Sequence, residues 1–248
     1  MPKFFIDKTQ IADNIIKITG EDSHHISRSL RMAVGEKITV TDNEAMEYDC
    51  TLEVFGDGYV LAKIDDKHFS ASEPPIKVHL YQALPKGEKL DFIIQKSVEC
   101  GVYDITPFES ERCIAKVKGE SEDRKTDRRN KIALEAAKQC GRGIIPKVNP
   151  TISFESMMQK SMSSDAILFC YEGEGTLSLG KVLKELRSSR EINDLSIIIG
   201  SEGGFSLSEA NAMKEKGALM IGLGKRILRA ETAAIMALSC LIYEFELN

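Results

Sequence analysis

From residue 77 onward the chain alternates between short apolar runs and segments with a helical pattern. The runs suit buried strands, and strands are predicted at five places: 77–84, 103–108, 165–171, 195–200 and 219–224. Helices are predicted at about 88–100 and 127–140, and a last helix is predicted to begin near Ala230. Because strands that alternate with helices form parallel sheets covered on both faces, this part is predicted to be an α/β domain.

The first 72 residues have a different pattern, short strands joined by turns. Strands are predicted at 36–42, 46–55 and 59–64, as in a small β-barrel. The polar stretch 67–77, with two adjacent prolines, is predicted to be a linker. Two domains follow from this reading, a β-barrel over 1–72 and an α/β domain over 73–248.

Three of the predicted strands end in polar or glycine-rich turns. The turns lie in YEGEG (171–175), IIIGSEGGFSLSE (197–209) and IGLGKRILRAETAA (221–234). Ligands bind at the carboxyl ends of parallel strands, where glycine lets the backbone turn tightly and approach a ligand. One such turn can be purely structural, but three together indicate a ligand pocket. The P-loop and G-x-G-x-x-G patterns do not match these glycines, so the common phosphate-binding loops do not explain it.

Composition argues against several classes of protein. The 248 residues, 42% hydrophobic and 29% charged, are typical of soluble globular proteins. No run approaches the roughly 20 apolar residues of a membrane span, and the first residues lack a signal-peptide pattern, so a cytoplasmic protein without membrane association is expected. The six cysteines form no C-x-x-C pair, and His24 and His25 lack companion ligands, so no metal site is predicted.

The net charge of −5 is unevenly distributed along the chain. Residues 112–147 hold 11 Lys and Arg against 5 Asp and Glu, a local charge of +6. Such a segment can neutralise phosphates of a nucleic acid. On charge alone, a solvated helix face is the simpler interpretation.

Five segments together resemble SPOUT-class RNA methyltransferases with a trefoil-knotted fold, specifically the 16S ribosomal RNA uridine N3-methyltransferases of the RsmE type. They are HHISRSLRMAVGE (24–36), QKSVECGVYDITPFESER (95–112), KIALEAAKQCGRGIIPKV (131–148), IGSEGGFSLSE (199–209) and LGKRILRAETA (223–233). The resemblance spans the chain, and the last two segments together are its most specific part. Ser201 departs from the pattern, which usually has proline there; its loss frees φ and restores an N–H in the turn.

The resemblance implies a PUA-like β-barrel that binds RNA, followed by a knotted methyltransferase domain that works as a homodimer with S-adenosylmethionine. The implied substrate is a uridine of 16S ribosomal RNA, either naked or in the small ribosomal subunit. Matched by motif, three loops hold the cofactor through Leu168, Tyr171, Glu172, Gly200, Glu202, Gly203, Gly204, Leu223, Gly224, Ile227 and Leu228.

The implied reaction needs little catalytic machinery, because the sulfonium methyl group is already electrophilic. Uridine N3 must lose a proton, which Glu231 or Glu202 would accept. Arg229 or Arg226 would stabilise the charge that spreads onto the uracil oxygens. For Glu231, a structural place in the first turn of the last helix is an equal alternative.

RNA contacts are expected from both predicted domains. In the barrel they would come from His24, His25, Arg28 and Arg31, although one histidine could instead fill the core. In the basic segment they would come from Arg112, Arg128, Arg129 and Arg142. Two other functions stay open, methylation of another RNA such as transfer RNA and RNA binding without catalysis.

Overall fold

The computed structural model describes three ranges of the chain, 1–114, 122–189 and 191–248. These residues form two compact units. The first consists of Met1–Glu73 and Ala137–Ile145, the second of Pro74–Ala136 and Pro146–Asn248. The predicted boundary at 72/73 thus lies one residue from the first break in the structure. However, the prediction left 137–145 in the second domain, whereas this segment packs with the first unit.

The first unit is built on a six-stranded mixed sheet with the order β1-β4-β5-β6-β3-β2. Its strands are β1 (Lys3–Phe5), β2 (Ile11–Ala12), β3 (Ile15–Thr19), β4 (Lys37–Thr41), β5 (Met46–Gly56) and β6 (Tyr59–Phe69). Short helical segments are η1 (Lys8–Gln10), α1 (Gly20–His24) and η2 (His25–Ser29). The edge strands β1 and β2 do not pair with each other, so the sheet is a half-barrel rather than a closed barrel.

The strand predictions for this unit hold where the apolar alternation is long. β4, β5 and β6 match them, but β6 continues to Phe69 and takes up part of the predicted linker. The strands β1, β2 and β3 were not predicted; β1 and β2 have only three and two residues, but β3 is as long as β4. Alternate residues of β3 and β4 face one core, for example the fully buried Ile16 and Ile38.

The segment 137–145 is held in the first unit by a buried ion pair. Arg142 is 3% exposed, and its Nε and Nη2 donate to the two carboxylate oxygens of Glu73 at 3.0 and 2.7 Å. The same carboxylate accepts the backbone N–H groups of Gly143 at 2.7 Å and Ile144 at 3.2 Å. Arg142 is therefore committed to the fold, and we withdraw it from the expected RNA contacts.

The second unit is an α/β domain around an eight-stranded sheet in which every pairing is parallel. The order is β10-β8-β7-β13-β11-β14-β12, with β9 also paired to β8. The strands are β7 (Lys77–Ala83), β8 (Asp104–Glu109), β9 (Lys147–Val148), β10 (Ile152–Ser153), β11 (Ala166–Cys170), β12 (Leu177–Ser178), β13 (Asp194–Ile199) and β14 (Leu219–Gly222). The five predicted strands and the parallel sheet are confirmed, whereas the two-residue strands were missed.

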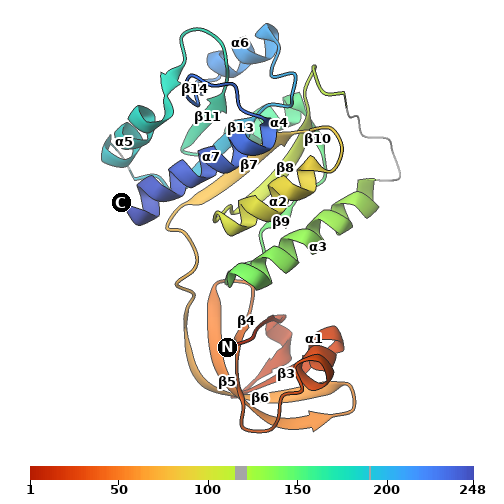
Figure 1. Ribbon diagram of the computed structural model, residues 1–248. Coiled ribbons are helices and arrows are strands. Elements are labelled where there is room, and N and C mark those ends of the chain that lie inside the picture. Colours follow the sequence, from red (N-terminus) through yellow and green to blue (C-terminus); the bar gives the residue numbers. More distant parts are fainter. Residues whose placement is uncertain (115–121, 190) are drawn as a thin grey trace. The chain divides into compact units, whose positions relative to one another are not determined.

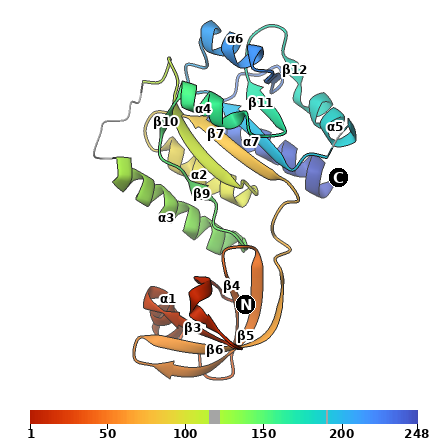
Figure 2. The ribbon, with the colours of Figure 1, turned by 180° about the vertical axis from the view of Figure 1, so that it is seen from behind.

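Helices cover both faces of this sheet, as Figures 1 and 2 show: α2 and α7 lie on one face and α4 on the other. The helices are α2 (Lys89–Glu99), α3 (Glu122–Cys140), α4 (Phe154–Ser161), α5 (Leu179–Ser189), α6 (Leu207–Glu215) and α7 (Ala230–Ile242), which η4 (Tyr243–Leu247) extends. The predictions of α2 and of an α7 that begins at Ala230 are confirmed. α3 is already helical at Glu122, five residues before its predicted start.

One histidine ties three strands together at the amino-terminal end of the sheet. Nδ1 of His79 in β7 lies 3.0 Å from the Asp104 carboxylate in β8, and its Nε2 lies 3.1 Å from the Asp194 carboxylate in β13. Burial disfavours the charged imidazole, but the two carboxylates outweigh burial and raise the pKa of His79 above its ordinary value of 6.5.

This arrangement predicts a pH-dependent contribution of His79 to stability. Because the folded-state pKa is raised, the contribution is fully present below about pH 6.5 and is lost as pH rises through the folded pKa. The difference in free energy of unfolding between wild type and His79→Gln should therefore be larger at pH 6 than at pH 9. Urea unfolding of both proteins at the two pH values measures it, and a difference independent of pH would contradict the prediction.

Candidate active site

The carboxyl ends of β11, β13 and β14 border a cavity of about 790 Å³. Its walls come from three loops, 170–176, 199–207 and 221–230, joined by Arg112 after β8 and Ala233 of α7. The three strands are parallel neighbours in the sheet, so their carboxyl ends meet at one edge. The three turns that the sequence singled out therefore enclose one pocket, as expected.

The loop after β13 is a tight turn whose backbone forms part of the wall. The N–H of Gly204 donates to the carbonyl of Ser201 at 2.9 Å, and Gly204 has a φ of +64°, which favours glycine. A Cβ on Gly203 would lie only 3.0 Å from Cβ of Arg112 and 3.2 Å from its carbonyl oxygen. Glycine at 203 thus lets this loop pack directly against the segment that follows β8.

Arg112 and Glu209 fix that packing. Nη1 of Arg112 donates to the carbonyl of Gly203 at 3.1 Å. Glu209 accepts the N–H of Ser206 at 2.9 Å in a capping box at the start of α6, and with its other oxygen accepts the N–H of Glu111 at 2.8 Å. The spacing of Ser206 and Glu209 is the usual one for a cap, whereas the bond to Glu111 joins two loops that are distant in the sequence. The loops after β8 and β13 are consequently held as one wall.

Lys89 of α2 lies between the two carboxylates that were candidates for the catalytic base. Its Nζ is 2.7 Å from Oε1 of Glu202 and 3.7 Å from Oε2 of Glu231. Burial disfavours a charged Glu202, but the hydrogen bonds from Lys89 and from the N–H of Lys86 outweigh burial and lower the pKa of Glu202. A carboxylate with a lowered pKa that already binds an ammonium group is a weak base.

Glu231 does not line the cavity. Its Oε2 is buried without a hydrogen-bond partner and faces Lys89, because the first turn of α7 packs toward α2. The geometry gives the structural alternative for Glu231 more support than the role of base.

Leu168 also lies outside the cavity. It is fully buried in the middle of β11, between Ile197 of β13 and Leu219 of β14. We withdraw Leu168 as a cofactor contact, since the polar loop begins only after β11 ends. The other predicted residues line the cavity: Tyr171, Glu172, Gly200, Glu202, Gly203, Gly204, Leu223, Gly224, Arg226, Ile227, Leu228 and Arg229.

Further lining residues were not named individually as contacts; Cys170, Ser201 and Lys225 lie inside the three predicted cofactor segments, and Thr176, Phe205 and Leu207 lie just outside them. All of them lie within or next to the quoted motifs, so position relative to the glycines was the available signal. Lys225, Arg226 and Arg229 are exposed at this cavity. Within the part of the chain that the structure describes, no carboxylate lies within 4.0 Å of their charged groups. The cavity thus has unneutralised positive charge beside it, which suits a polyanionic substrate.

The predicted RNA contacts differ in their availability. His24, His25, Arg28 and Arg31 are all exposed on or just after the helical segment α1–η2. The His25 ring also packs edge-on against Phe4, with ring centroids 6.2 Å apart. Neither histidine is therefore a core residue.

In the basic helix α3 the two adjacent arginines differ in their exposure to solvent. The Arg128 side chain is 62% exposed and pairs with Asp91 of α2. Arg129 is 8% exposed, and its Nη1 donates to Glu122 at 2.8 Å and to Thr151 at 3.2 Å. We withdraw Arg129 from the expected RNA contacts, because it could reach a phosphate only by breaking a buried pair.

Among residues 1–114, 122–189 and 191–248, no three His, Cys, Asp or Glu side chains come together as a metal site. In the same ranges no helix combines the length and the apolar character that crossing a membrane requires.

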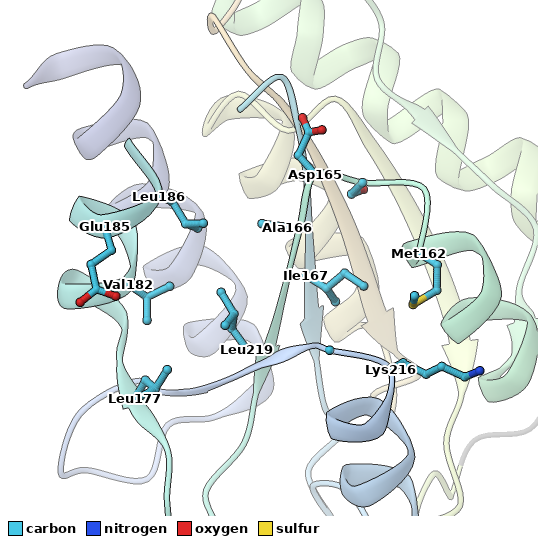
Figure 3. Close-up of a pocket in the computed structure, with 12 residues that line it drawn as sticks. Met162, Asp165, Ala166, Ile167, Leu177, Val182, Glu185, Leu186, Lys216 and Leu219 are labelled. Carbon is cyan, nitrogen blue, oxygen red and sulfur yellow. The ribbon is translucent and has the colours of Figure 1, made fainter. Parts of the chain in front are cut away.

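A second cavity, of about 460 Å³, lies at the amino-terminal ends of β11 and β14 beside α5 (Figure 3). Apolar side chains such as Ile167, Val182 and Leu219 point into it, and charged groups such as Lys216 stand around it. None of the glycine-rich turns reaches this end of the strands, and ligands of parallel sheets bind at the other. The first cavity is therefore the candidate active site.

Comparison with known proteins agrees with this geometry. Residues 72–242 match the family model of an RNA methyltransferase domain, and residues 18–65 match an RNA methyltransferase PUA domain. Ribosomal RNA small subunit methyltransferase E of Bacillus subtilis is 34% identical, over 100% of this chain and 98% of its own length. The protein of the same name from Buchnera aphidicola is 30% identical, over 97% of this chain and 92% of its own.

Two solved structures resemble the chain over almost its whole length. A ribosomal RNA small subunit methyltransferase E from Neisseria gonorrhoeae, bound to S-adenosylmethionine, has a TM-score of 0.84 and 28% identity, covering 98% of this chain and 97% of its own. A methyltransferase from Legionella pneumophila in complex with S-adenosylmethionine has a TM-score of 0.80 and 30% identity, covering 97% and 96%. On this sequence similarity, fold and site, the chain belongs to the ribosomal RNA small subunit methyltransferase E family.

Proposed function

We propose that this protein transfers a methyl group from S-adenosylmethionine to N3 of a uridine in 16S ribosomal RNA. The observation that carries the proposal is the cavity at the carboxyl ends of β11, β13 and β14, with unneutralised cations beside it. The relatives' names and the S-adenosylmethionine bound in two of their structures support the cofactor and the RNA class. The choice of uridine N3 rests on the resemblance of the motifs.

The residues around the cavity suit this cofactor. Small-molecule sites commonly measure 300–1,000 Å³ and combine apolar walls with a few polar groups, and this cavity of about 790 Å³ falls within that range. Phe205, Leu223 and Leu228 offer apolar surface for a nucleoside. Gly204 and Gly224, both with positive φ, let the backbone of two loops form the wall. These two loops, with 170–176, would hold the cofactor largely through backbone groups.

When bound, S-adenosylmethionine supplies an electrophilic methyl group, so the protein must align N3 of the uracil and favour its deprotonation. Arg229 lines the cavity with an exposed side chain that makes no hydrogen bond to its own helix terminus. From there its guanidinium would stabilise the negative charge that develops on the uracil oxygens, and Arg226 would assist. Glu202 binds Lys89 and Glu231 is turned away, so neither carboxylate is assigned as the base. The N3 proton would leave to solvent water, and Arg229 would stabilise the uracil anion that remains.

The proposal includes a homodimer and a knotted chain, both taken from the family resemblance. The packed pair α2 and α7–η4 leaves aromatic surface open, since Phe92 is 47% exposed and Tyr243 58%. A second protomer covering this surface would remove it from water. Light scattering at micromolar concentration should give the mass of a dimer, and a monomer would contradict this part.

Two measurements test the proposed function. Calorimetry should detect binding of S-adenosylmethionine, and mass mapping of 16S ribosomal RNA from a strain lacking the protein should find one methyluridine missing. Adding the protein to naked RNA or to isolated small subunits from that strain then identifies the substrate form. Restored methylation of transfer RNA instead, or no cofactor binding at all, would overturn the proposal in favour of one of the two alternatives.

A further inference from the structure

One hydroxyl group of a residue beside the cavity has no hydrogen-bond partner among the described residues. Ser201 lines the cavity and is 8% exposed, and its Oγ is buried without a hydrogen bond. Of the buried side-chain oxygen and nitrogen atoms without partners in the described ranges, it is the one that belongs to a cavity-lining residue. An unpaired buried hydroxyl costs stability, so such groups call for an explanation.

The turn around Ser201 does not need this hydroxyl. The turn closes through the backbone, where the N–H of Gly204 donates to the carbonyl of Ser201, and α6 is capped by Ser206 and Glu209. The Oγ therefore stabilises neither the turn nor the helix that follows. Ser201 itself lines the cavity, although its Oγ is buried in the conformation seen in this structure.

A serine hydroxyl can change direction without any movement of the backbone. Rotation about Cα–Cβ moves Oγ among three staggered positions, and a hydroxyl both donates and accepts. Because Ser201 borders the cavity, a ligand bound there could form the hydrogen bond that the Oγ lacks among the described residues. S-adenosylmethionine has suitable groups in both halves, the ribose hydroxyls and ring nitrogens of adenosine and the ammonium and carboxylate of the methionine part.

We propose that Ser201 is a cofactor-binding residue whose hydroxyl hydrogen-bonds to S-adenosylmethionine and is left unpaired without it. This inference rests on the proposed function, since it concerns the same cavity. It adds a side-chain contact to a site otherwise built mainly from backbone. It also gives a role to a position at which the motif departs from the pattern of the family that it resembles.

Ser201→Ala is expected to weaken cofactor binding without lowering the stability of the protein. Without ligand the variant should melt at the wild-type temperature or above it, because it loses an unpaired polar group. Its affinity for S-adenosylmethionine should fall about fivefold to tenfold, the range expected for one hydrogen bond. A residue with a purely structural role would lose stability instead.

The matched control is Ser206→Ala, the same substitution five residues along. The Oγ of Ser206 accepts the N–H of Glu209 at 3.3 Å and caps α6, so this variant should melt below wild type without ligand. The melting temperature of Ser206→Ala should fall, whereas that of Ser201→Ala should stay the same or rise. This difference would show that the Ser206 hydroxyl stabilises the fold and the Ser201 hydroxyl does not.

Calorimetry of wild type and Ser201→Ala with S-adenosylmethionine and with 5′-methylthioadenosine, which lacks the amino-acid part, tests the contact. Equal losses for both ligands place the bond on the adenosine half, and a loss for S-adenosylmethionine alone places it on the amino-acid half; either supports the proposal. Unchanged affinity for S-adenosylmethionine, including the case in which only the KM for RNA rises, overturns it. Failure of the wild type to bind S-adenosylmethionine would instead count against the proposed function.

Discussion

Replacing Arg229 by alanine is expected to lower turnover about 10²–10³-fold, the effect of removing one donor that stabilises transition-state charge. The affinity for S-adenosylmethionine should stay nearly unchanged, because the charge develops on the uracil and not on the cofactor. The fold should tolerate the change, since the Arg229 side chain is exposed and makes no capping bond to α7. Single-turnover methyl transfer at saturating RNA, together with calorimetry of the cofactor, measures both quantities.

The matched control for Arg229 is Arg128→Ala, which also removes one exposed arginine. The Arg128 side chain is 62% exposed on α3 and is proposed to contact a phosphate. This variant should bind RNA more weakly with a flatter salt dependence, while turnover at saturating RNA stays nearly intact. Loss of cofactor binding or unfolding in Arg229→Ala would make Arg229 a structural residue and contradict its catalytic assignment.

The sequence predicted those parts of the fold that depend on local pattern. The strands β7, β8, β11, β13 and β14 are mainly apolar runs of four to seven residues, and their parallel order follows from the helices between them. The cavity was predictable for the same reason, since polar turns at the ends of neighbouring parallel strands must converge. Two-residue strands such as β9 and β12 carry no comparable signal, and only their neighbours in space make them strands.

Side-chain roles were harder to predict wherever a distant partner decides them. Arg129 stands beside Arg128 in the sequence, yet one helical step turns it toward Glu122 and away from solvent. Glu231 was placed in the site by its motif, but Lys89, 142 positions earlier, draws it toward α2. From the residue type, Arg129 was predicted to contact RNA and Glu231 to accept a proton. In the structure, each is instead held by an oppositely charged side chain from another part of the chain.

The ion pair of Arg142 and Glu73 in the first unit is another case in which a distant partner decides the role of a residue. Arg142 lies in the basic segment 112–147, for which phosphate contacts were predicted, and sequence alone could not distinguish a phosphate contact from a structural ion pair. In the structure its side chain is 4% exposed and that of Glu73 14%. Glu73 also accepts the backbone N–H groups of residues 143 and 144. The ion pair and these two bonds together hold the segment 137–145 in the first unit.

Arg142→Ala is accordingly expected to lower the free energy of unfolding by about 3–5 kcal/mol, the cost of removing one partner from a buried ion pair. The Glu73 carboxylate would keep its bonds to the backbone but lose its counter-charge. Arg142→Lys should recover only part of the loss, because an ammonium group cannot donate from the planar fork that reaches both oxygens. Urea unfolding measures these differences.

Arg128→Ala serves again as the control, since an exposed pair contributes about 0–1 kcal/mol. If Arg142→Ala unfolds with wild-type stability but binds RNA more weakly, Arg142 belongs among the RNA contacts after all. If it is destabilised while Arg128→Ala is not, and Arg128→Ala alone shows the flattened salt dependence in its folded state, the two arginines have the separate roles that their exposure indicates. The basic segment would then contain both a phosphate contact and a structural ion pair, a distinction set by burial rather than by charge.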